Sequence, residues 1–264
     1  MKKLSIIIPA YNEEGRIGST LKRYRAFFSN LKKKKILDYE IIVVLNACKD
    51  NTLGVCNQHK CENLKTVCFE QAGKGFAVTE GFKEALKGRS EYIGFVDADC
   101  STPPEAFYDL VKNMGDADGA IANRWDKKSI INTKQPFLRK VVSRGGNFII
   151  RSLFIIPHRD TQCGAKVFRR RVLEKVLPKL GSSEWSFDVD LLFYMRREKA
   201  KIKSVPTTWE DKKESKLNLR KTPAKFFFSI IRLRLIHSPF KFIVRAHSKL
   251  PEKYKVGSLI NKIK

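Results

Sequence analysis

The sequence predicts an α/β protein in which a mainly parallel sheet is flanked by helices. Short apolar runs rich in Val and Ile recur along the first half of the chain, as expected for strands buried on both faces. Stretches with helical spacing separate these runs, and such alternation is typical of doubly wound sheets. The chain has 264 residues, of which 42% are hydrophobic, so it is long and apolar enough for one large domain or two small ones.

Strands and helices alternate in the first half. The first strand is the β-branched run at residues 4–8, which Pro9 ends, and Gly88 is expected to end the third helix. Further strands are expected at residues 39–45, 64–69 and 92–96, and helices at residues 17–31, 52–58 and 75–86. Ligands of such sheets bind beyond the carboxyl ends of the strands. Polar residues gather at those ends, at positions 11–13, 46–50 and 97–101.

The second half is expected to begin with a helix at Pro103-Pro104-Glu105. A strand at residues 119–122, a helix at 137–154, a strand at 166–168 and helices at 171–176 and 187–197 are expected to follow. No stretch is rich enough in Gly, Ser or Pro to require a flexible linker, and no internal repeat is evident.

The charge of the chain is strongly positive and unevenly spread. Lys and Arg number 53 against 27 Asp and Glu, which gives a formal net charge of +26. Residues 195–264 hold 20 of these cations and only 5 of the acids. This imbalance predicts attraction to a polyanion such as nucleic acid, an anionic bilayer or a phosphorylated substrate. No helix-turn-helix, zinc-finger or RNP-type motif supports nucleic-acid binding, which stays the non-enzyme alternative.

The cysteines and the apolar runs argue against several other classes. Cys48, Cys56, Cys61 and Cys68 are irregularly spaced and no CxxC occurs, so a zinc site is not expected and the thiols are expected to be reduced. The run at residues 4–8 is too short for a signal peptide. No stretch approaches the roughly 20 apolar residues of a membrane-spanning helix.

The strongest chemical signal is Asp97-Ala98-Asp99, which follows the predicted strand at residues 92–96. Two carboxylates one residue apart at a sheet edge form a hard oxygen site that suits Mg²⁺ or Mn²⁺ with a diphosphate. The metal would neutralise the charge that grows on a departing phosphate. Taken alone, the triplet is equally compatible with loop or helix-capping residues.

The order of three motifs resembles that of the family 2 glycosyltransferases. They are SIIIPAYNEE at residues 5–14, Gly73-Lys74-Gly75 and the acidic triplet. DTQCG at residues 160–164, WSFDV at 185–189, and Trp209 followed by Ser215-Lys216-Leu217 are most similar to the dolichyl-phosphate hexosyltransferases, above all the glucosyl branch. The resemblance covers nearly the whole chain. It implies a GT-A fold over residues 1–220 and one-step, inverting transfer of a hexose, with UDP-glucose favoured as donor.

The resemblance also implies roles for particular residues. Pro9, Tyr11, Glu13 and Asn46 would line the nucleotide pocket, with Lys74 as a helper and Lys216 near the donor diphosphate. Asp97 would face the ribose and the metal, and Asp99 would be the main protein ligand of Mg²⁺ or Mn²⁺. Arg124 and Arg139 would grip the phosphate of a polyprenyl or dolichyl acceptor. Asp188 and Glu184 fall on the acceptor side, as an acid or base or as helix caps.

The chemistry of a lipid phosphate acceptor agrees with these roles. It is already anionic near neutral pH, so it needs positioning and charge compensation rather than a strong general base. Arginine's planar fork suits that task better than lysine. Without the resemblance, Arg124 and Arg139 would more simply be surface ion-pair residues.

Two positions depart from the family pattern. Asn46 stands where the family usually has an aspartate that accepts a hydrogen bond from the base, so the choice of base is open. This departure also leaves a degenerate, inactive relative as an alternative. Ser101 stands where the mannosyl relatives often place a glutamine beside the metal, which makes Ser101 a speculative third ligand.

The C-terminal segment, residues 221–264, is basic and rich in aromatic residues. Its apolar clusters at residues 225–236 and 239–245 predict interfacial helices on an anionic membrane surface, with packing on the sheet as the alternative. The chain is therefore expected to be cytoplasmic and peripherally bound to the cytoplasmic face of a membrane. A family 2 enzyme with a polysaccharide, glycolipid or protein-linked glycan acceptor stays an alternative, since the donor-side motifs would be the same.

Overall fold

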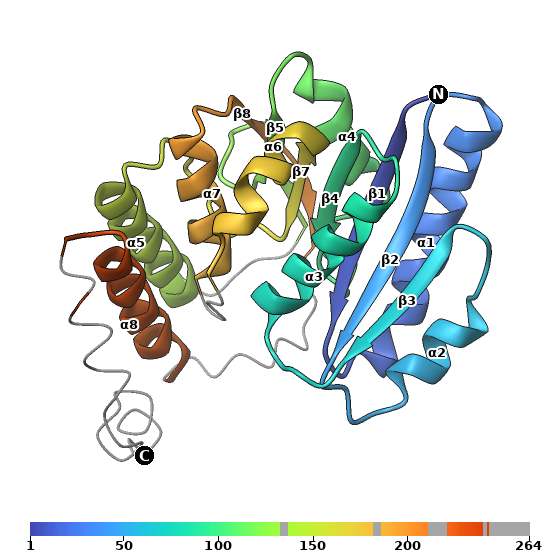
Figure 1. Cartoon of the computed structure of the whole chain (residues 1–264), viewed down its shortest axis with the longest axis horizontal. Coiled ribbons are helices and arrows are strands. Elements are labelled where there is room, and N and C mark those ends of the chain that lie inside the picture. The colour runs from blue at the N-terminus through green and yellow to red at the C-terminus, as the bar shows by residue number, and fades with distance from the viewer. Residues whose placement is uncertain (133–136, 182–185, 211–220, 240–241, 243–264) are drawn as a thin grey trace.

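In the computed structural model of the chain, helices cover both faces of a seven-stranded sheet (Figure 1). The structure describes residues 1–132, 137–181, 186–210, 221–239 and 242. For residues 137–143 and 221–228 it describes the helical backbone and not the side chains. The predicted α/β class with a mainly parallel sheet is confirmed.

The sheet has the strand order β3-β2-β1-β4-β7-β5-β8. Its strands are β1 (Lys3–Ala10), β2 (Asp38–Asn46), β3 (Leu64–Phe69), β4 (Tyr92–Val96), β5 (Gly119–Asn123), β7 (Ala165–Arg169) and β8 (Ile202–Pro206). β7 is antiparallel to both of its neighbours, whereas the other pairs are parallel. The start of β7 therefore lies at the edge where β4 and β5 end. Two short strands, β6 (Ile130–Ile131) and β9 (Thr208–Trp209), form a separate parallel pair.

Side chains on the two faces of the sheet belong to two apolar cores. Along β1, Leu4, Ile6 and Ile8 face one core and Ile7 the other, as the alternation of a strand requires. α1 (Glu14–Lys33), α2 (Thr52–Gln58) and α4 (Pro104–Met114) close the first core. α3 (Lys74–Lys87), α5 (Phe137–Phe154), α6 (Arg170–Val176), α7 (Phe187–Arg197) and α8 (Lys221–Ile236) close the second, and a 3₁₀ turn at Leu177–Lys179 follows α6.

The elements predicted up to residue 197 are confirmed within a few residues, and three strands were missed. The second predicted interfacial helix, at residues 239–245, lies almost entirely outside the described residues. β8 lacks an apolar run because it is an edge strand whose side chains are mostly exposed or half-buried. β6 and β9 are too short to produce a pattern. The antiparallel direction of β7 was also not predicted, since the sequence of a strand does not encode its direction.

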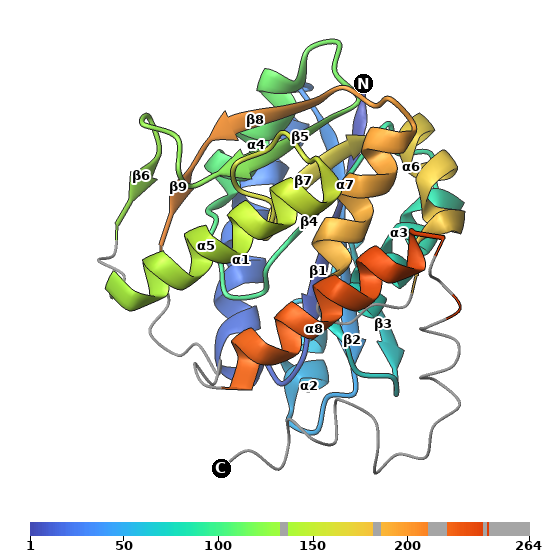
Figure 2. The same ribbon diagram turned by 90° about the vertical axis from the view of Figure 1, so that its left-hand side faces the viewer.

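α8 packs next to α5 on the face of the sheet that holds the second core (Figure 2). Ile230 and Leu233 are buried in the second core, and His237 Nε2 lies 3.0 Å from the buried Asp190 carboxylate of α7. The exposed side of α8 carries Ile231 and Ile236. Among the described residues, no helix combines the length and apolarity that crossing a bilayer requires. Contact of this segment with a membrane stays a prediction.

Candidate active site

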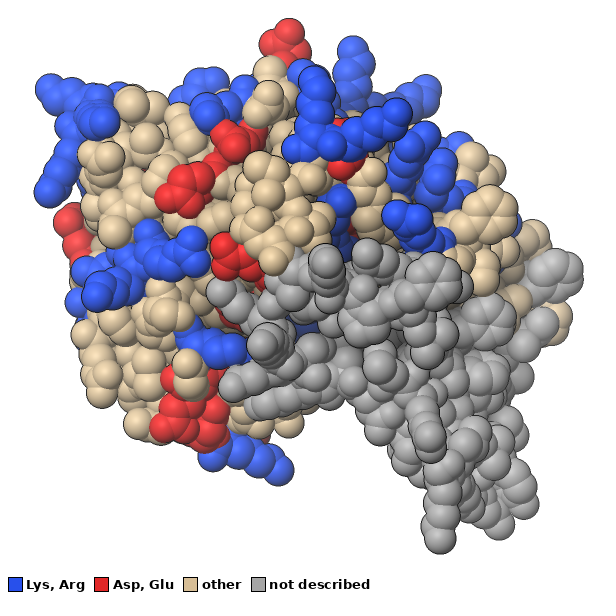
Figure 3. All heavy atoms as spheres, turned by 180° about the vertical axis from the view of Figure 1, so that it is seen from behind, with Lys and Arg blue, Asp and Glu red and all other residues tan. Residues whose placement is uncertain are grey.

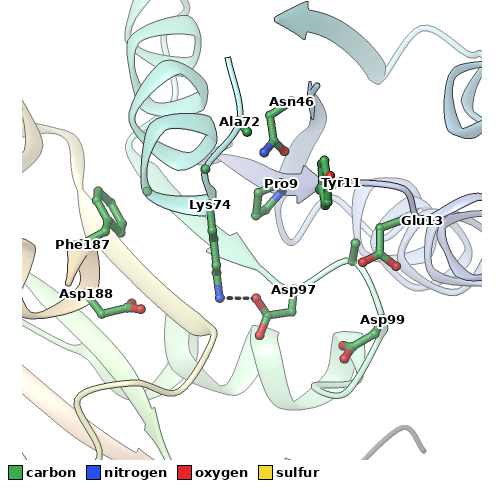
Figure 4. A pocket seen from close by; sticks show the side chains of 13 residues that line it. Pro9, Tyr11, Glu13, Asn46, Ala72, Lys74, Asp97, Asp99, Phe187 and Asp188 are labelled. Atoms are coloured by element: carbon green, nitrogen blue, oxygen red, sulfur yellow. Dashed lines mark hydrogen bonds and ion pairs between the residues drawn. The ribbon is translucent and has the colours of Figure 1, made fainter. Parts of the chain in front are cut away.

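A pocket of about 600 Å³ opens at the carboxyl ends of β1, β2 and β4 (Figure 4). The starts of α3 and α7 complete its walls. Eight of the residues singled out in the sequence line it together: Pro9, Tyr11, Glu13, Asn46, Lys74, Asp97, Asp99 and Asp188. Such a volume suits a ligand of nucleotide size. The fold thus brings predicted residues from five separate stretches of the chain together in one cavity.

The loops around this pocket hold strained backbone. Asn12, Ala47 and Cys100 follow β1, β2 and β4, and their φ angles are 54°, 53° and 56°. Non-glycine residues adopt this left-handed conformation only where the surrounding structure enforces it, and such residues cluster at functional sites. One such constraint is visible between two of these loops, because Asn12 Oδ1 accepts a hydrogen bond of 2.7 Å from the Lys49 N–H.

One end of the pocket is formed by Tyr11 and Glu13. Tyr11 is 48% exposed and lines the pocket, so its ring is accessible to a planar ligand. Glu13 forms a two-pronged ion pair with Arg16, in which both N–H···O distances are 2.7 Å. This pair fixes the orientation of the Glu13 carboxylate at the pocket wall.

Asn46 joins two walls of the pocket. In the orientation that satisfies its neighbours, its amide nitrogen donates to the Ala10 carbonyl at 2.8 Å and its oxygen accepts from the Gly73 N–H at 3.1 Å. An aspartate could not donate to Ala10. The departure from the family pattern therefore has a structural reason, because Asn46 ties the end of β1 to the start of α3.

The middle of the pocket is formed by the start of α3. Gly73 has a φ angle of +126°, which favours glycine, and Lys74 and Gly75 begin the helix. Exposed N–H groups at a helix start favour anions such as phosphates. Lys74 Nζ lies 2.5 Å from Asp97 Oδ1. Desolvation lowers the pKa of Lys74, but the Asp97 and Asp188 carboxylates outweigh it and raise that pKa, so the lysine is charged at neutral pH.

The acidic triplet faces the same space. Asp97 and Asp99 line the pocket, and Asp99 Oδ1 accepts a 2.9 Å hydrogen bond from the Ser101 N–H. Within the described residues, no cluster of three or more His, Cys, Asp or Glu forms a closed metal cage. Two carboxylates with space in front of them fit Mg²⁺ or Mn²⁺ that takes its other ligands from a diphosphate and water. Ser101 is buried and does not line the pocket, so its backbone rather than its hydroxyl faces Asp99.

Gly164, which lies just before β7, packs against the Asp97 carboxylate. A Cβ atom added to Gly164 would lie 1.8 Å from Asp97 Oδ2, which is far inside van der Waals contact. The absence of a side chain at this position therefore makes room for the Asp97 carboxylate.

Arg124 lies beside the pocket and not in its wall. Its Nε and Nη2 each donate to the buried Asp160 carboxylate at 2.8 Å, and its backbone N–H donates to the same group at 3.0 Å. The guanidinium also stacks over the Trp209 ring at 5.3 Å from the centroid. Burial lowers the pKa of Arg124, but Asp160 more than compensates and raises it. Contact of Arg124 with an acceptor phosphate stays a prediction.

Three predicted residues lie outside what the structure describes. Arg139 belongs to α5, but its side chain is not described, and Glu184 and Lys216 fall in undescribed stretches. Sequence reasoning in turn missed Lys166, whose buried ammonium contacts Asp188. A lysine between the apolar residues Ala165 and Val167, at the start of a predicted strand, was the signal that could have revealed it.

The comparisons with known proteins agree with this geometry. Residues 5–177 match the model of the family described as Glycosyl transferase family 2. The chain belongs to this family. It is 30% identical over 245 residues to dolichyl-phosphate beta-glucosyltransferase of Dictyostelium discoideum, covering 88% of this chain and 73% of the relative. It is 32% identical over 231 residues to the protein of the same name from Drosophila melanogaster, covering 81% and 69%.

This family 2 glycosyltransferase has the same fold as a protein of known structure. That protein is glucosyl-3-phosphoglycerate synthase from Mycobacterium tuberculosis in complex with Mn²⁺, UDP-glucose and phosphoglyceric acid. The TM-score is 0.59 at 16% sequence identity, with 87% of this chain and 80% of that chain covered. The predicted GT-A fold and glycosyltransferase class are confirmed.

The contact between Gly164 and Asp97 predicts a large loss of activity in Gly164→Ala. The added methyl group must push the Asp97 carboxylate away from Lys74, and a displacement of about 1 Å at a reacting centre can cost about a hundredfold in rate. Glycosyl transfer is measured as an initial rate at saturating donor. Gly145→Ala is the matched control, because nothing lies within 4 Å of its new Cβ atom. Equal rates for the two variants would contradict the proposed support of Asp97.

Proposed function

We propose that this family 2 glycosyltransferase transfers glucose from UDP-glucose to dolichyl or another polyprenyl phosphate, with inversion and with Mg²⁺ or Mn²⁺. The observation that carries the proposal is the single pocket that joins Tyr11, the start of α3 and the Asp97–Asp99 pair. The names of the relatives from Dictyostelium and Drosophila support dolichyl phosphate as acceptor and glucose as the sugar.

The parts of the donor match successive parts of the pocket. The base would stack on Tyr11 between Pro9 and Asn46, and the diphosphate would meet the N–H groups and Lys74 at the start of α3. Asp97 and Asp99 would hold the divalent metal, which when bound neutralises charge on the leaving diphosphate. Lys74 contributes a second positive charge at the same place.

The acceptor is proposed to approach from the Asp188 side. Asp188 is paired with the buried Lys166 at 2.5 Å, so it is already charge-compensated and is a poor candidate for a strong base. A lipid monophosphate needs no such base, because it is itself anionic. Arg124, Arg139 and Lys216 are proposed to compensate charge around the acceptor and the diphosphate, as the family resemblance implies.

A transfer assay tests the proposal. Purified protein with Mn²⁺ or Mg²⁺ and polyprenyl phosphate in detergent is given radiolabelled UDP-glucose, GDP-mannose or UDP-N-acetylglucosamine in parallel. A mild-acid-labile labelled lipid from UDP-glucose is the expected result. If only another donor gives a lipid product, the sugar of that donor replaces glucose in the proposal. Donor binding with no lipid product would move the acceptor to a polysaccharide, glycolipid or protein-linked glycan, or would indicate an inactive relative.

A lipid acceptor also implies that the enzyme acts at the cytoplasmic face of a membrane. Residues 221–264 are proposed to contact that membrane. Lys and Arg side chains are spread over the back of the molecule, which favours an anionic leaflet (Figure 3). Ile231 and Ile236 on α8 are 36% and 43% exposed, so they are available for insertion between headgroups.

Vesicle binding checks this contact. The full chain is expected to sediment with vesicles that contain phosphatidylserine, more weakly at high salt, and Ile231→Ser/Ile236→Ser is expected to weaken binding about tenfold. Leu53→Ser is the control, because Leu53 is 43% exposed on α2, away from α8 (Figure 1). Binding that is unchanged by the double substitution would place the membrane contact elsewhere.

A further inference from the structure

Lys166 occupies an unusual place for a lysine. It lies on β7 in the interior of the sheet, opposite Phe95 of β4 and Ile121 of β5, and its side chain is 0% exposed. A buried ammonium is costly unless it is paired and hydrogen-bonded. An apolar residue at this position would satisfy the strand and the core equally well, so packing alone does not account for the charge.

Lys166 contacts Asp188, a residue of the active-site pocket. Its Nζ donates to Asp188 Oδ1 at 2.5 Å and to the Cys163 carbonyl at 2.7 Å, and it lies 5.2 Å from the centroid of the Phe95 ring. Asp188 is 19% exposed and lines the pocket. The buried cation therefore holds a pocket carboxylate from behind, on the side away from the ligand space.

The place of Asp188 in the pocket suggests what it meets. Tyr11 and Asn46 lie at one end of the cavity, Lys74 and Asp97 lie in the middle, and Asp188 lies at the opposite end (Figure 4). If the base lies on Tyr11 and the diphosphate at the start of α3, as in the proposed function, the sugar of the donor extends toward Asp188. A carboxylate is an acceptor only, and it suits the hydroxyl groups of a hexose.

We propose that Lys166 is a positioning residue that fixes the Asp188 carboxylate toward the sugar of the donor. Lys74 is the cation that would otherwise compete for Asp188, since both Asp97 and Asp188 attract it. By supplying a fixed counter-charge, Lys166 keeps Asp188 at the sugar end and leaves Lys74 with Asp97 near the diphosphate. Lys166 then affects recognition of the sugar and not of the nucleotide. This inference rests on the proposed function for the direction in which the donor lies.

Binding of UDP-glucose and of UDP, each with Mn²⁺, separates these effects in the full chain. Lys166→Met keeps the length of the side chain and removes its charge. It is expected to weaken UDP-glucose binding about tenfold, measured by calorimetry, and to leave UDP binding within about twofold of wild type. Lys203→Met is the matched control, because Lys203 also lies on a strand but is exposed. Equal weakening of both ligands would overturn the proposal.

A double-mutant cycle excludes a merely structural role. Asp188→Asn is expected to cause a similar selective loss, and Lys166→Met/Asp188→Asn is expected to add little further loss for UDP-glucose. Fully additive losses would overturn the proposal. If Lys166→Met does not fold, Lys166→Gln, which also removes the charge, supplies the same comparison with and without Asp188→Asn. A wild-type chain that prefers another nucleotide sugar would overturn glucose as the donor, and the cycle is then measured with that sugar nucleotide and its free nucleotide.

Discussion

Asp99→Asn is expected to lower glycosyl transfer by about 10³-fold while leaving the fold intact. The substitution keeps the oxygen that accepts the Ser101 N–H, so the loop is preserved, but it removes the negative charge that a divalent metal requires. A metal that stabilises a departing diphosphate contributes several kcal/mol, and each 1.36 kcal/mol corresponds to about tenfold in rate.

Initial rates over a range of Mn²⁺ concentrations test this expectation, and thermal unfolding checks the fold. Higher Mn²⁺ should recover part of the lost rate. Asp109→Asn is the matched control, because Asp109 is an exposed aspartate on α4 that pairs only with Lys112 among the residues described. An Asp99→Asn enzyme with the activity and the metal dependence of wild type would remove Asp99 from the metal site.

Asp160→Ala is expected to lower the free energy of unfolding by about 3–5 kcal/mol, the usual cost of removing one partner of a buried ion pair. Asp160 is 1% exposed and accepts hydrogen bonds from two side-chain nitrogens and the backbone N–H of Arg124. Removal of the carboxylate leaves the guanidinium largely buried with no counter-charge. Urea unfolding at pH 7 measures the loss, and Asp109→Ala in an exposed pair should cost at most about 1 kcal/mol.

The pH dependence gives a second check of the same pair. Burial raises the pKa of Asp160, but Arg124 outweighs it, so that pKa lies below the ordinary value of 3.8. The stabilisation is therefore complete above pH 3.8 and is lost as the pH falls through the lower native pKa. The difference between wild type and Asp160→Ala should shrink in that acidic range. A difference that is constant from pH 7 to the acid limit would contradict the ion-pair explanation.

The residues around the donor could be predicted because they stand in short motifs, each directly after a predicted strand or at the start of a predicted helix. Each polar cluster follows its own buried strand, and parallel strands bring their carboxyl ends to one edge. The contacts of Asn46, Asp160 and Lys166 could not be predicted in this way. Lys166 meets Asp188 and Asp160 meets Arg124 only because distant segments come together in the fold. Ser101 was proposed as a ligand because mannosyl relatives often place a glutamine at this position; it is buried and does not line the pocket, and metal ligation by its hydroxyl stays a prediction.

The single reversed strand has a consequence for the order in which the enzyme folds. β2 pairs with β1, and β3 with β2, across one helix each, whereas β4 pairs with β1, and β7 with β4 and β5, only after longer intervening stretches of chain. Closing such a long loop is slow compared with forming neighbouring pairs. Because the loop before β7 carries Asp160 and Gly164, a folding chain would acquire its nucleotide-facing wall first. It would become competent for catalysis only when β7 docks, and protection of the β7 amides from hydrogen exchange would report that step.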